Sequence, residues 1–397
     1  MRPVRVLLFH AEPAADAGPH VRLLAEARLA LATRQRNEWL AAGADDVRIL
    51  AGPPDDLSFG ERLRAAALGG RPLAGAGALG GIVVAGSGTM PLATVATLRR
   101  FVEVAAGPDG HALANNRYSA DVVAISRTAD LAELPLLPSD NALPRWLEEC
   151  AGVMVADLSH LWRLGFDVDT PLDLLLLGHA AGRWGGHSSL LGERLGEPGG
   201  HSPLFDERLG EQLDALSAVL ANRRAELLLA GRVSTSTLRF LQTGVACRVR
   251  ALVEERGLRA ASQLAQAGGA PAAATPPAPG SSPAAPATRP PRSILGELLD
   301  RDGPASLARH VAALADAAVI DSRVLMAHRF GAAESAWPVP EDRFASDLLN
   351  ASAVTDPWLR TLTASAAAAS APILLGGHTL VNGGLRLLAR RARSAAT

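Results

Sequence analysis

The alternation of strand-like and helix-like segments over the first 125 residues limits the possible folds more than any other feature of the sequence. Short apolar runs at residues 4–9, 46–50 and 81–85 predict strands, and longer stretches at 21–42 and 59–68 predict helices. Strands that alternate with helices pair in parallel, because each helix carries the chain back across the sheet. We therefore predict an α/β fold, with a mainly parallel sheet flanked by helices in a Rossmann-like three-layer arrangement. Ligands of such folds bind beyond the carboxyl ends of the strands.

A turn of small residues follows the third predicted strand. It contains Gly86, Ser87, Gly88 and Thr89, and we expect a helix to begin near Pro91. Small residues let backbone amides approach a phosphate at a helix N-terminus. The turn is therefore a candidate nucleotide-binding segment, although Pro91 stands where a dinucleotide fingerprint has its third glycine. The alternative is a tight turn that binds no ligand.

Two aspartates, Asp167 and Asp169, precede a predicted helix. In extended backbone, residues two apart project from the same face, so both carboxylates could share one cation. Hard cations such as Mg²⁺ take oxygen ligands and usually keep several waters. Thr170 suits the helix N-cap, Pro171 the first helical position and Asp173 a capping box. The alternative is that Asp169 and Asp173 only cap this helix and that Asp167 is solvated.

Polar side chains gather just before the apolar segment 122–125. Asn115 and Asn116 could read a base edge or a ribose through paired donors and acceptors, and Asp121 could add a third carboxylate. The same amides could equally satisfy the backbone of their own loop. Function is the favoured interpretation, because so many polar types converge ahead of a buried strand.

The composition excludes several kinds of chemistry. All 39 basic residues are arginine, so Schiff-base chemistry, pyridoxal phosphate attachment and a phosphate-loop lysine are ruled out. A net charge of −1 provides no electrostatic footprint for nucleic acid. No apolar run is long enough to span a bilayer, and the two distant cysteines, Cys150 and Cys247, fit free thiols in a reducing compartment. We expect a cytoplasmic protein that binds neither nucleic acid nor membrane, in an oligomeric state that the sequence leaves open.

The second half of the chain suggests a second domain. We expect the first domain to span residues 1–178 and a glycine-rich connector to span 179–204. Strand-like and helical segments resume over 205–397, which predicts a second α/β domain. Within it, the Pro/Ala-rich tract 263–292 has the composition of a disordered insert.

The second predicted domain has its own candidate site residues. Asp321, Arg323 and His328 follow the end of an apolar strand, and His378 lies in a glycine-containing turn between a strand and a helix. His328 and Asp321 could form an acid–base pair. A histidine beside a core strand is more often structural, and that alternative stays open.

The small-residue turn followed by Met90-Pro91-Leu92, the central polar segment and the DVDTPLDL motif together resemble a known superfamily. They are similar to nucleotidyltransferases of the nucleotide-diphospho-sugar transferase (GT-A-like) superfamily, and within it to molybdenum-cofactor and 2-phospholactate guanylyltransferases. The resemblance covers the N-terminal half only. It implies Mg²⁺-dependent transfer of a nucleoside monophosphate from a nucleoside triphosphate, GTP or CTP, to a phosphorylated small-molecule acceptor, with release of pyrophosphate.

The resemblance also assigns residues. Asp167 and Asp169 match the family's late aspartate motif, but Thr89 stands where the family has a metal-binding aspartate. The family's N-terminal glycine-rich loop with its arginine and lysine is missing, and Arg28 is among the arginines that could replace it. Two further hypotheses therefore remain. One is a catalytically degenerate protein that binds a nucleotide or sugar nucleotide; the other is an isomerase, lyase or hydrolase of the C-terminal domain acting on a small phosphorylated substrate.

Overall fold

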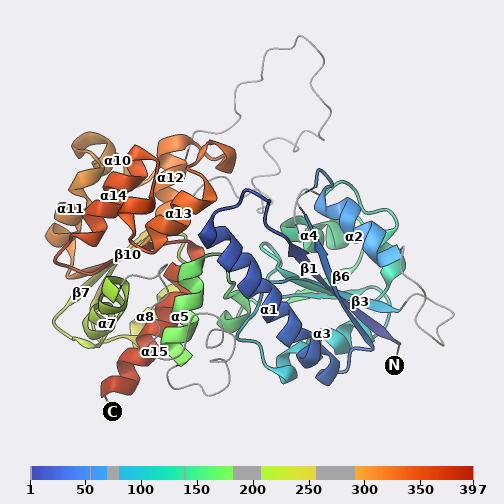
Figure 1. Cartoon of the computed structure of the whole chain (residues 1–397). Helices are drawn as coiled ribbons and strands as arrows, with labels where there is room; N and C mark the ends of the chain where they lie inside the picture. Colours follow the sequence, from blue (N-terminus) through green and yellow to red (C-terminus); the bar gives the residue numbers. More distant parts are fainter. Residues whose placement is uncertain are drawn as a thin grey trace, which may run out of the picture. The chain divides into compact units, whose positions relative to one another are not determined.

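The computed structural model describes residues 2–53, 55–68, 80–137, 140–181, 207–255 and 291–396 (Figure 1). The chain divides into two compact units. Unit 1 comprises Met1–Phe205 and Asn382–Arg391, and unit 2 comprises Asp206–Val381 and Ala392–Thr397. The predicted connector beyond residue 181 and the predicted insert up to residue 290 lie outside the described residues.

Unit 1 contains a six-stranded sheet with the strand order β2-β1-β3-β5-β4-β6. Every pairing is parallel except those of β5, which runs antiparallel to both β3 and β4. The strands are β1 (Val4–Ala11), β2 (Asp46–Gly52), β3 (Gly81–Gly86), β4 (His111–Ala114), β5 (Val122–Ile125) and β6 (Met154–Asp157). The mainly parallel sheet predicted from the sequence is therefore confirmed.

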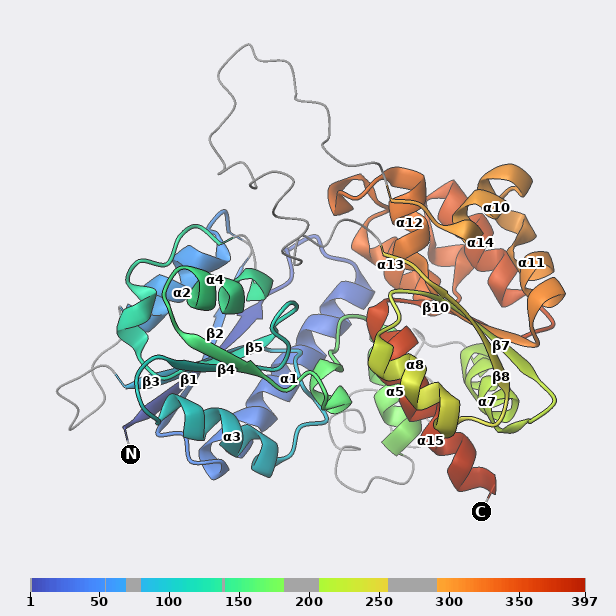
Figure 2. The same cartoon turned by 180° about the vertical axis from the view of Figure 1, so that it is seen from behind.

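Helices cover both faces of this sheet, as Figure 2 shows from behind. They are α1 (Pro19–Ala41), α2 (Phe59–Leu68), α3 (Val95–Ala105) and α4 (Leu143–Glu149). Unit 1 also contains α5 (Pro171–Ala181) and the 3₁₀ turns η1 (Thr128–Leu131), η2 (Asp140–Ala142) and η3 (Trp162–Gly165). Alternate residues of β1 enter different cores: Val6 and Leu8 pack with Trp39 of α1, whereas Leu7 packs with Leu63 of α2. Burial on both sides makes unit 1 a three-layer α/β structure.

One predicted helix start is wrong. The sequence placed it near Pro91, but α3 begins at Val95, after Thr94 accepts a hydrogen bond from the Thr97 amide as N-cap. Met90 has a φ of 48°, in the left-handed region, and the chain continues through a turn before the helix. The chain between the end of β3 at Gly86 and the start of α3 at Val95 is therefore longer than the short turn that the sequence predicted.

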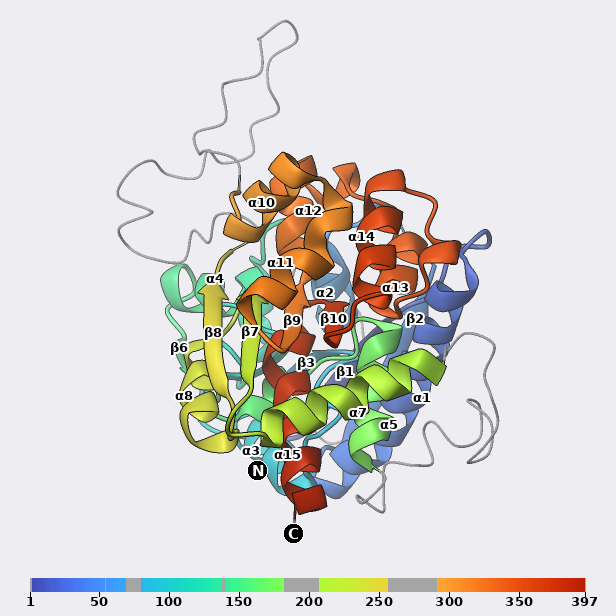
Figure 3. The same cartoon turned by 90° about the vertical axis from the view of Figure 1, so that its left-hand side faces the viewer.

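Unit 2 has a four-stranded, wholly parallel sheet in the order β10-β9-β7-β8 (Figure 3). Its strands are β7 (Glu226–Gly231), β8 (Arg248–Val253), β9 (Ala317–Asp321) and β10 (Ile373–Gly376). Its helices are α7 (Glu207–Ala221), α8 (Thr235–Gly244), α10 (Ile294–Asp302), α11 (Leu307–Leu314), α12 (Ser322–Phe330), α13 (Pro340–Asp347) and α14 (Pro357–Ala367), with the 3₁₀ turns η4 (Pro304–Ser306), η5 (Glu334–Ala336) and η6 (Ala351–Ala353). The second α/β fold predicted from the sequence is confirmed.

The C-terminal helix α15 (Leu385–Ala396) follows a π-helical turn, Leu380–Gly384. Its residues up to Arg391 belong with unit 1, and those from Ala392 with unit 2. Among the described helices, none combines the length and the hydropathy that a membrane crossing requires.

Candidate functional site

The small-residue turn and the aspartate segment of unit 1 are in direct contact. The Met90 amide donates a hydrogen bond to Oδ1 of Asp167 (3.3 Å), and the Val168 amide donates to the Gly88 carbonyl (2.9 Å). A Cβ atom on Gly88 would lie 2.9 Å from the Val168 carbonyl oxygen and 2.9 Å from Nε of Arg28. Gly88 is therefore required here for close approach, and the two segments form one corner at the carboxyl end of β3.

Helix α1 holds both sides of this corner. Gln35 donates to the Thr89 carbonyl (2.7 Å), and Arg34 donates to the Pro91 carbonyl (2.9 Å). About two turns earlier, Arg28 donates through Nε to the Val168 carbonyl (2.6 Å) and through Nη2 to Oδ1 of Asp169 (3.0 Å). The sequence named Arg28 as a possible replacement for the missing loop, and the structure places it against the aspartate segment.

Asn115 fixes Asp121 in place. Its Nδ2 donates to Oδ2 of Asp121 (2.9 Å) and to the Leu164 carbonyl (2.9 Å), and its Oδ1 accepts from the amides of Asp121 (3.0 Å) and Val122 (3.2 Å). Both amide hydrogens and both acceptor sites of this side chain are thus used within the protein. Asn116 accepts from the Tyr118 amide (3.0 Å). In this structure, the two amides satisfy their own loop, which is the alternative that the sequence left open.

Four carboxylates of unit 1 influence one another. Burial raises the pKa of Asp121 to about 7; the Asn115 hydrogen bond opposes the shift, and the charges of Asp140 and Asp169 add to it. Burial also raises the pKa of Asp167 well above its usual range, and the charges of Asp121 and Asp169 raise it further. A buried group of like charges is electrostatically costly, and a bound cation would offset that cost.

Asp140 was not foreseen as a member of this group. Oδ1 of Asp140 accepts from the Asn141 amide (2.9 Å) at the start of η2. Burial nevertheless raises the pKa of Asp140, and so does the charge of Asp169. The proximity of Asp140 to Asp169 depends on the fold, because the two residues are 29 positions apart in the chain.

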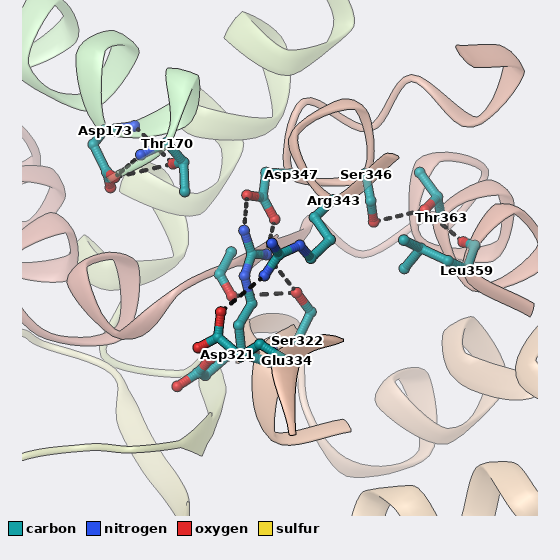
Figure 4. Close-up of polar contacts among 12 residues, drawn as sticks. Thr170, Asp173, Asp321, Ser322, Glu334, Arg343, Ser346, Asp347, Leu359 and Thr363 are labelled. Carbon is teal, nitrogen blue, oxygen red and sulfur yellow. Dashed lines mark hydrogen bonds and ion pairs between the residues drawn. The ribbon is translucent and has the colours of Figure 1, made fainter. Parts of the chain in front are cut away.

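The predicted capping of α5 is confirmed (Figure 4). Oδ2 of Asp173 accepts from the Thr170 amide (2.8 Å), and Oγ1 of Thr170 accepts from the Asp173 amide (3.4 Å), with Pro171 as the first helical residue. Asp167 is buried, and the carboxylate of Asp169 bonds to Arg28. The part of the alternative that assigns a cap to Asp173 is therefore confirmed, whereas a solvated Asp167 and a capping side chain at Asp169 are wrong.

A buried histidine and serine also meet at this corner. Nδ1 of His10, near the end of β1, lies 3.0 Å from Oγ of Ser87. Burial lowers the pKa of His10, and the nearby Arg28 charge lowers it further against the opposing effect of Glu12. His10 is therefore neutral near pH 7 and holds the hydroxyl of the turn. Nothing in the sequence pattern singled it out.

The donor set of unit 1 fits a magnesium ion held by few protein ligands. Within the described residues, no group of three or more His, Cys, Asp or Glu side chains has the arrangement of a metal site. Mg²⁺, however, is commonly bound through one or two carboxylates, with waters and substrate phosphates completing its octahedron. Asp121 and Asp167, which are both buried and lie within interaction distance of each other, would be such a pair.

The candidates Asp321 and Arg323 of unit 2 form buried ion pairs. Asp321 accepts from Nε (2.6 Å) and Nη2 (3.1 Å) of Arg232, and Arg323 donates through Nη2 to Oδ2 of Asp347 (2.6 Å). Figure 4 shows Asp321, Ser322 and Asp347 in this network at the carboxyl end of β9. These contacts connect β9 to β7 and α13.

His328 has other partners than the one expected. It lies within α12, where Nδ1 accepts from the Ser293 amide (3.0 Å) and Nε2 lies 3.2 Å from Oδ2 of Asp300. Asp321 bonds to Arg232, so the expected His328–Asp321 pair is not formed. His378 follows β10 and is partly buried. The structure thus gives His328 a packing role against α10.

No protein-family model matches this chain, and no curated protein matches its sequence. Among solved structures, the chain is similar to a "putative nucleotide-diphospho-sugar transferase" from Desulfovibrio desulfuricans G20. The sequence identity is 17% and the TM-score 0.35, over 49% of this chain and 95% of the other. A TM-score this low says nothing about the activity of this chain.

Proposed function

We propose that unit 1 is a nucleotidyltransferase that transfers a nucleoside monophosphate from a nucleoside triphosphate to a phosphorylated small molecule. The observation that carries the proposal is the hydrogen bond from the Met90 amide to Asp167. It joins Asp167 to the small-residue turn, which follows the carboxyl end of β3, where ligands of α/β folds bind. The Gly86 amide at that strand end donates to the Asp121 carbonyl (3.3 Å), so Asp121 lies beside the same turn. Metal ligands and a phosphate-binding turn are the two parts that such a transfer requires.

Each residue has a definite part in this proposal. Asp121 and Asp167 hold the cation. Asn115 keeps Asp121 in position through a hydrogen bond, and Arg28 holds the partly exposed Asp169 through an ion pair. A Mg²⁺ ion bound there would neutralise negative charge on the triphosphate. Ser87, held by His10, lies in the turn that faces the phosphates.

The reaction needs no covalent bond to the protein. An oxygen of the acceptor phosphate attacks the α-phosphorus of the nucleoside triphosphate, the bond to the β-phosphate oxygen breaks, and pyrophosphate leaves. Catalysis of this kind relies on positioning and charge neutralisation. The absence of lysine leaves these tasks to carboxylates, arginine and backbone amides.

A pyrophosphate-release assay with the full chain tests the proposal. The four nucleoside triphosphates would be incubated with Mg²⁺ and a panel of small phosphorylated acceptors. We expect Asp167→Asn and Asp121→Asn to lower the rate at least about a hundredfold, because each removes a charge from the cation site. Asp157→Asn is the matched control, since Asp157 only binds the Ser159 turn at the end of β6. Release at the same rate in all three variants would refute the assignment.

A second candidate is a protein that binds a nucleotide or sugar nucleotide without turning it over. One observation favours it: Thr89 stands where the resemblance expects an aspartate, and its Oγ1 donates to the Gly86 carbonyl within the turn (2.9 Å). This candidate predicts nucleotide binding that is independent of Mg²⁺, with no pyrophosphate released. Restoring a carboxylate with Thr89→Asp should then confer Mg²⁺ dependence on binding.

A further inference from the structure

The side chain of Arg343 on α13 lies close to a second arginine near the carboxyl end of β9. Figure 4 shows Arg343 pointing toward Asp347, Ser322 and Glu334. The guanidinium of Arg323 donates to both carboxylate oxygens of Asp347. Arg343 stands four positions before Asp347 on the same helix, so the two side chains share one helix face. Two guanidinium groups therefore lie beside one buried carboxylate, which accepts from Arg323.

Arg343 uses little of its hydrogen-bonding capacity within the part of the chain that the structure describes. Its Nε atom is buried and has no hydrogen-bond partner there. Its Nη1 atom donates to Oε2 of Glu334 across 3.4 Å, which is long for such a bond. The side chain of Glu334 is 49% exposed, whereas that of Arg343 is 15% exposed. Arg343 is thus a largely buried donor group whose contact with a carboxylate is weak and close to solvent.

The positive charge of Arg343 is unfavourable in this position. Burial lowers the pKa of Arg343, and the charge of Arg323 lowers it further, while Glu334 and Asp347 oppose the shift. The guanidinium nevertheless stays protonated, as arginine does in proteins. A further negative group beside it would offset both the burial of the charge and the repulsion between the two arginines.

The surroundings of Arg343 combine an aromatic ring with the carboxyl edge of the sheet. Cζ of Arg343 lies 5.8 Å from the centroid of the Trp337 ring. Ser322, directly after β9, donates to the Gly376 carbonyl at the end of β10 (3.3 Å). Three positions later, Thr379 has a buried hydroxyl for which the described residues provide no hydrogen-bond partner. Ligands of parallel α/β sheets bind beyond strand ends of this kind.

We propose that Arg343 binds the carboxylate of a small organic acid, in the place that the side chain of Glu334 takes in this structure. A guanidinium binds a carboxylate best through two parallel hydrogen bonds, and Arg343 offers such a fork. The side chain to be replaced is itself a carboxylate, so we assign the site to a carboxylate rather than to a phosphate. The Trp337 ring provides an apolar surface for the carbon part of the acid. No residue of unit 1 takes part, so the inference is independent of nucleotide transfer.

Nuclear magnetic resonance titration of the full chain with sodium propionate, butyrate and succinate tests the site. We expect at least one of these acids to shift the indole N–H signal of Trp337 and the Nε–H signal of Arg343 together, in a saturable manner. Butyramide, which is neutral and close in shape to butyrate, should shift neither signal. Inorganic phosphate should bind more weakly than the best of the acids.

Two substitutions should change the affinity for the acid in opposite directions. Arg343→Gln should weaken binding at least about tenfold, measured on the Trp337 signal, because the guanidinium is lost. Glu334→Gln should strengthen binding at least about threefold, because the competing carboxylate is removed. The matched controls are Arg329→Gln and Glu297→Gln, at exposed positions of α12 and α10, and each should change the affinity less than about twofold.

Thermal unfolding checks that each variant is folded, and Glu334→Gln tests the site at a half-exposed position, where the fold is least at risk. A purely structural Arg343 would leave the affinity of Glu334→Gln at the wild-type value. That result would overturn the inference. So would the lack of a saturable shift with all three acids, tighter binding of phosphate than of the acids, or equal affinity in the wild type and Arg343→Gln.

Discussion

At the scale of single residues, the most informative group is the pair Asp121 and Asp167. Burial raises the pKa of both carboxyls; Asp121 raises the pKa of Asp167 further, whereas a hydrogen bond with Asp167 opposes the shift of Asp121. Asn115 and the Met90 amide hold them through side-chain and backbone hydrogen bonds. A pair of this kind titrates as a unit, and the proposed cation would displace its protons on binding.

This pair predicts how pH affects both stability and cation binding. Because the pKa of folded Asp121 is raised from 3.8 to about 7, the folded chain holds that proton more tightly than the unfolded chain. Without a cation, the free energy of unfolding should therefore fall as the pH rises from about 4 to about 7. A cation requires the ionised form, so its stabilising effect should grow over the same range.

Melting curves at pH 5.5 and pH 8, with and without Mg²⁺, measure this dependence. We expect Mg²⁺ to raise the melting temperature more at the higher pH. Asp121→Asn should remove most of the difference, whereas Asp157→Asn, at a strand end outside the group, should keep it. A Mg²⁺ effect that is equal at both pH values in the wild type would contradict the account.

Only some of the residues around the turn of residues 86–90 could be predicted from the sequence. Asp167 was identifiable because it stands two residues from Asp169 ahead of a predicted helix, and Asp121 because it ends a polar segment ahead of an apolar run. His10 and Gln35 were not, because a single histidine at the end of a strand and a glutamine within a long helix have no distinctive pattern. Their partners, Ser87 and Thr89, are more than fifty positions away in the chain. Such contacts depend on how the segments fold together.

At the scale of elements, α5 shows how local sequence fixes a helix start that also serves the site. Thr170 and Asp173 satisfy each other's backbone amides, and Asp173 additionally accepts from the Asp169 amide (3.0 Å). The cap therefore orients the backbone that carries Asp167 and Asp169. The hydrogen bonds that cap α5 therefore also position the segment with Asp167 and Asp169.

Removing the cap should destabilise both the first turn of α5 and the backbone segment that carries Asp167 and Asp169. We predict that Thr170→Ala lowers the local stability of the first turn of α5 by about 1 kcal/mol. Hydrogen exchange of the amides of this turn would measure the loss. Thr361→Ala is the control, because the exposed hydroxyl of Thr361 only donates to the Pro357 carbonyl inside α14. Equal exchange rates in wild type and Thr170→Ala would show that the cap contributes nothing.

The sequence predicted the strands of unit 1 more successfully than their directions. Apolar runs at residues 81–85 and 122–125 were identified, because buried strands are short and apolar. The antiparallel direction of β5 was not, since a run of four apolar residues carries no directional information. The start of α3 was misplaced because Pro91 suits a first helical turn, while Thr94 supplies the cap that the helix uses.

At the scale of the whole molecule, unit 2 is held at the carboxyl edge of its sheet by buried ion pairs. The side chains of Arg323 and Asp347 are 7% and 0% exposed, and those of Arg232 and Asp321 are 10% and 0% exposed. Breaking such a pair by removing one partner leaves an uncompensated buried charge, which commonly costs about 3–5 kcal/mol. These pairs therefore control the stability of unit 2 rather than supply an acid–base pair.

We predict that Asp347→Asn destabilises unit 2 by about 3–5 kcal/mol, because Arg323 then lacks its counter-charge. Hydrogen exchange in β9 and α13 during urea titration would report the change. Arg250→Gln, which breaks an exposed pair with Glu226, should alter stability by less than about 1 kcal/mol. Similar effects of the two substitutions would mean that burial of the Arg323–Asp347 pair is unimportant.

The sequence predicted that the chain has two α/β regions, but not which segments belong to each unit. Two α/β regions were expected from the return of strand-like segments after residue 205, and both sheets are present. The membership of Asn382–Arg391 in unit 1 was not foreseen. It arises from contacts with the 162–166 segment, more than two hundred residues earlier, which no local pattern encodes.

The central claim is that Asp121 and Asp167 hold a divalent cation against a nucleoside triphosphate at the turn of residues 86–90. Electron paramagnetic resonance titration with Mn²⁺ in the presence of GTP or CTP tests it most directly, because free and bound Mn²⁺ are distinguished by signal. The account predicts one nucleotide-dependent Mn²⁺ site per chain, weakened at least about tenfold by Asp167→Asn and unchanged by Asp157→Asn. Mn²⁺ binding of equal affinity in wild type and Asp167→Asn would contradict it.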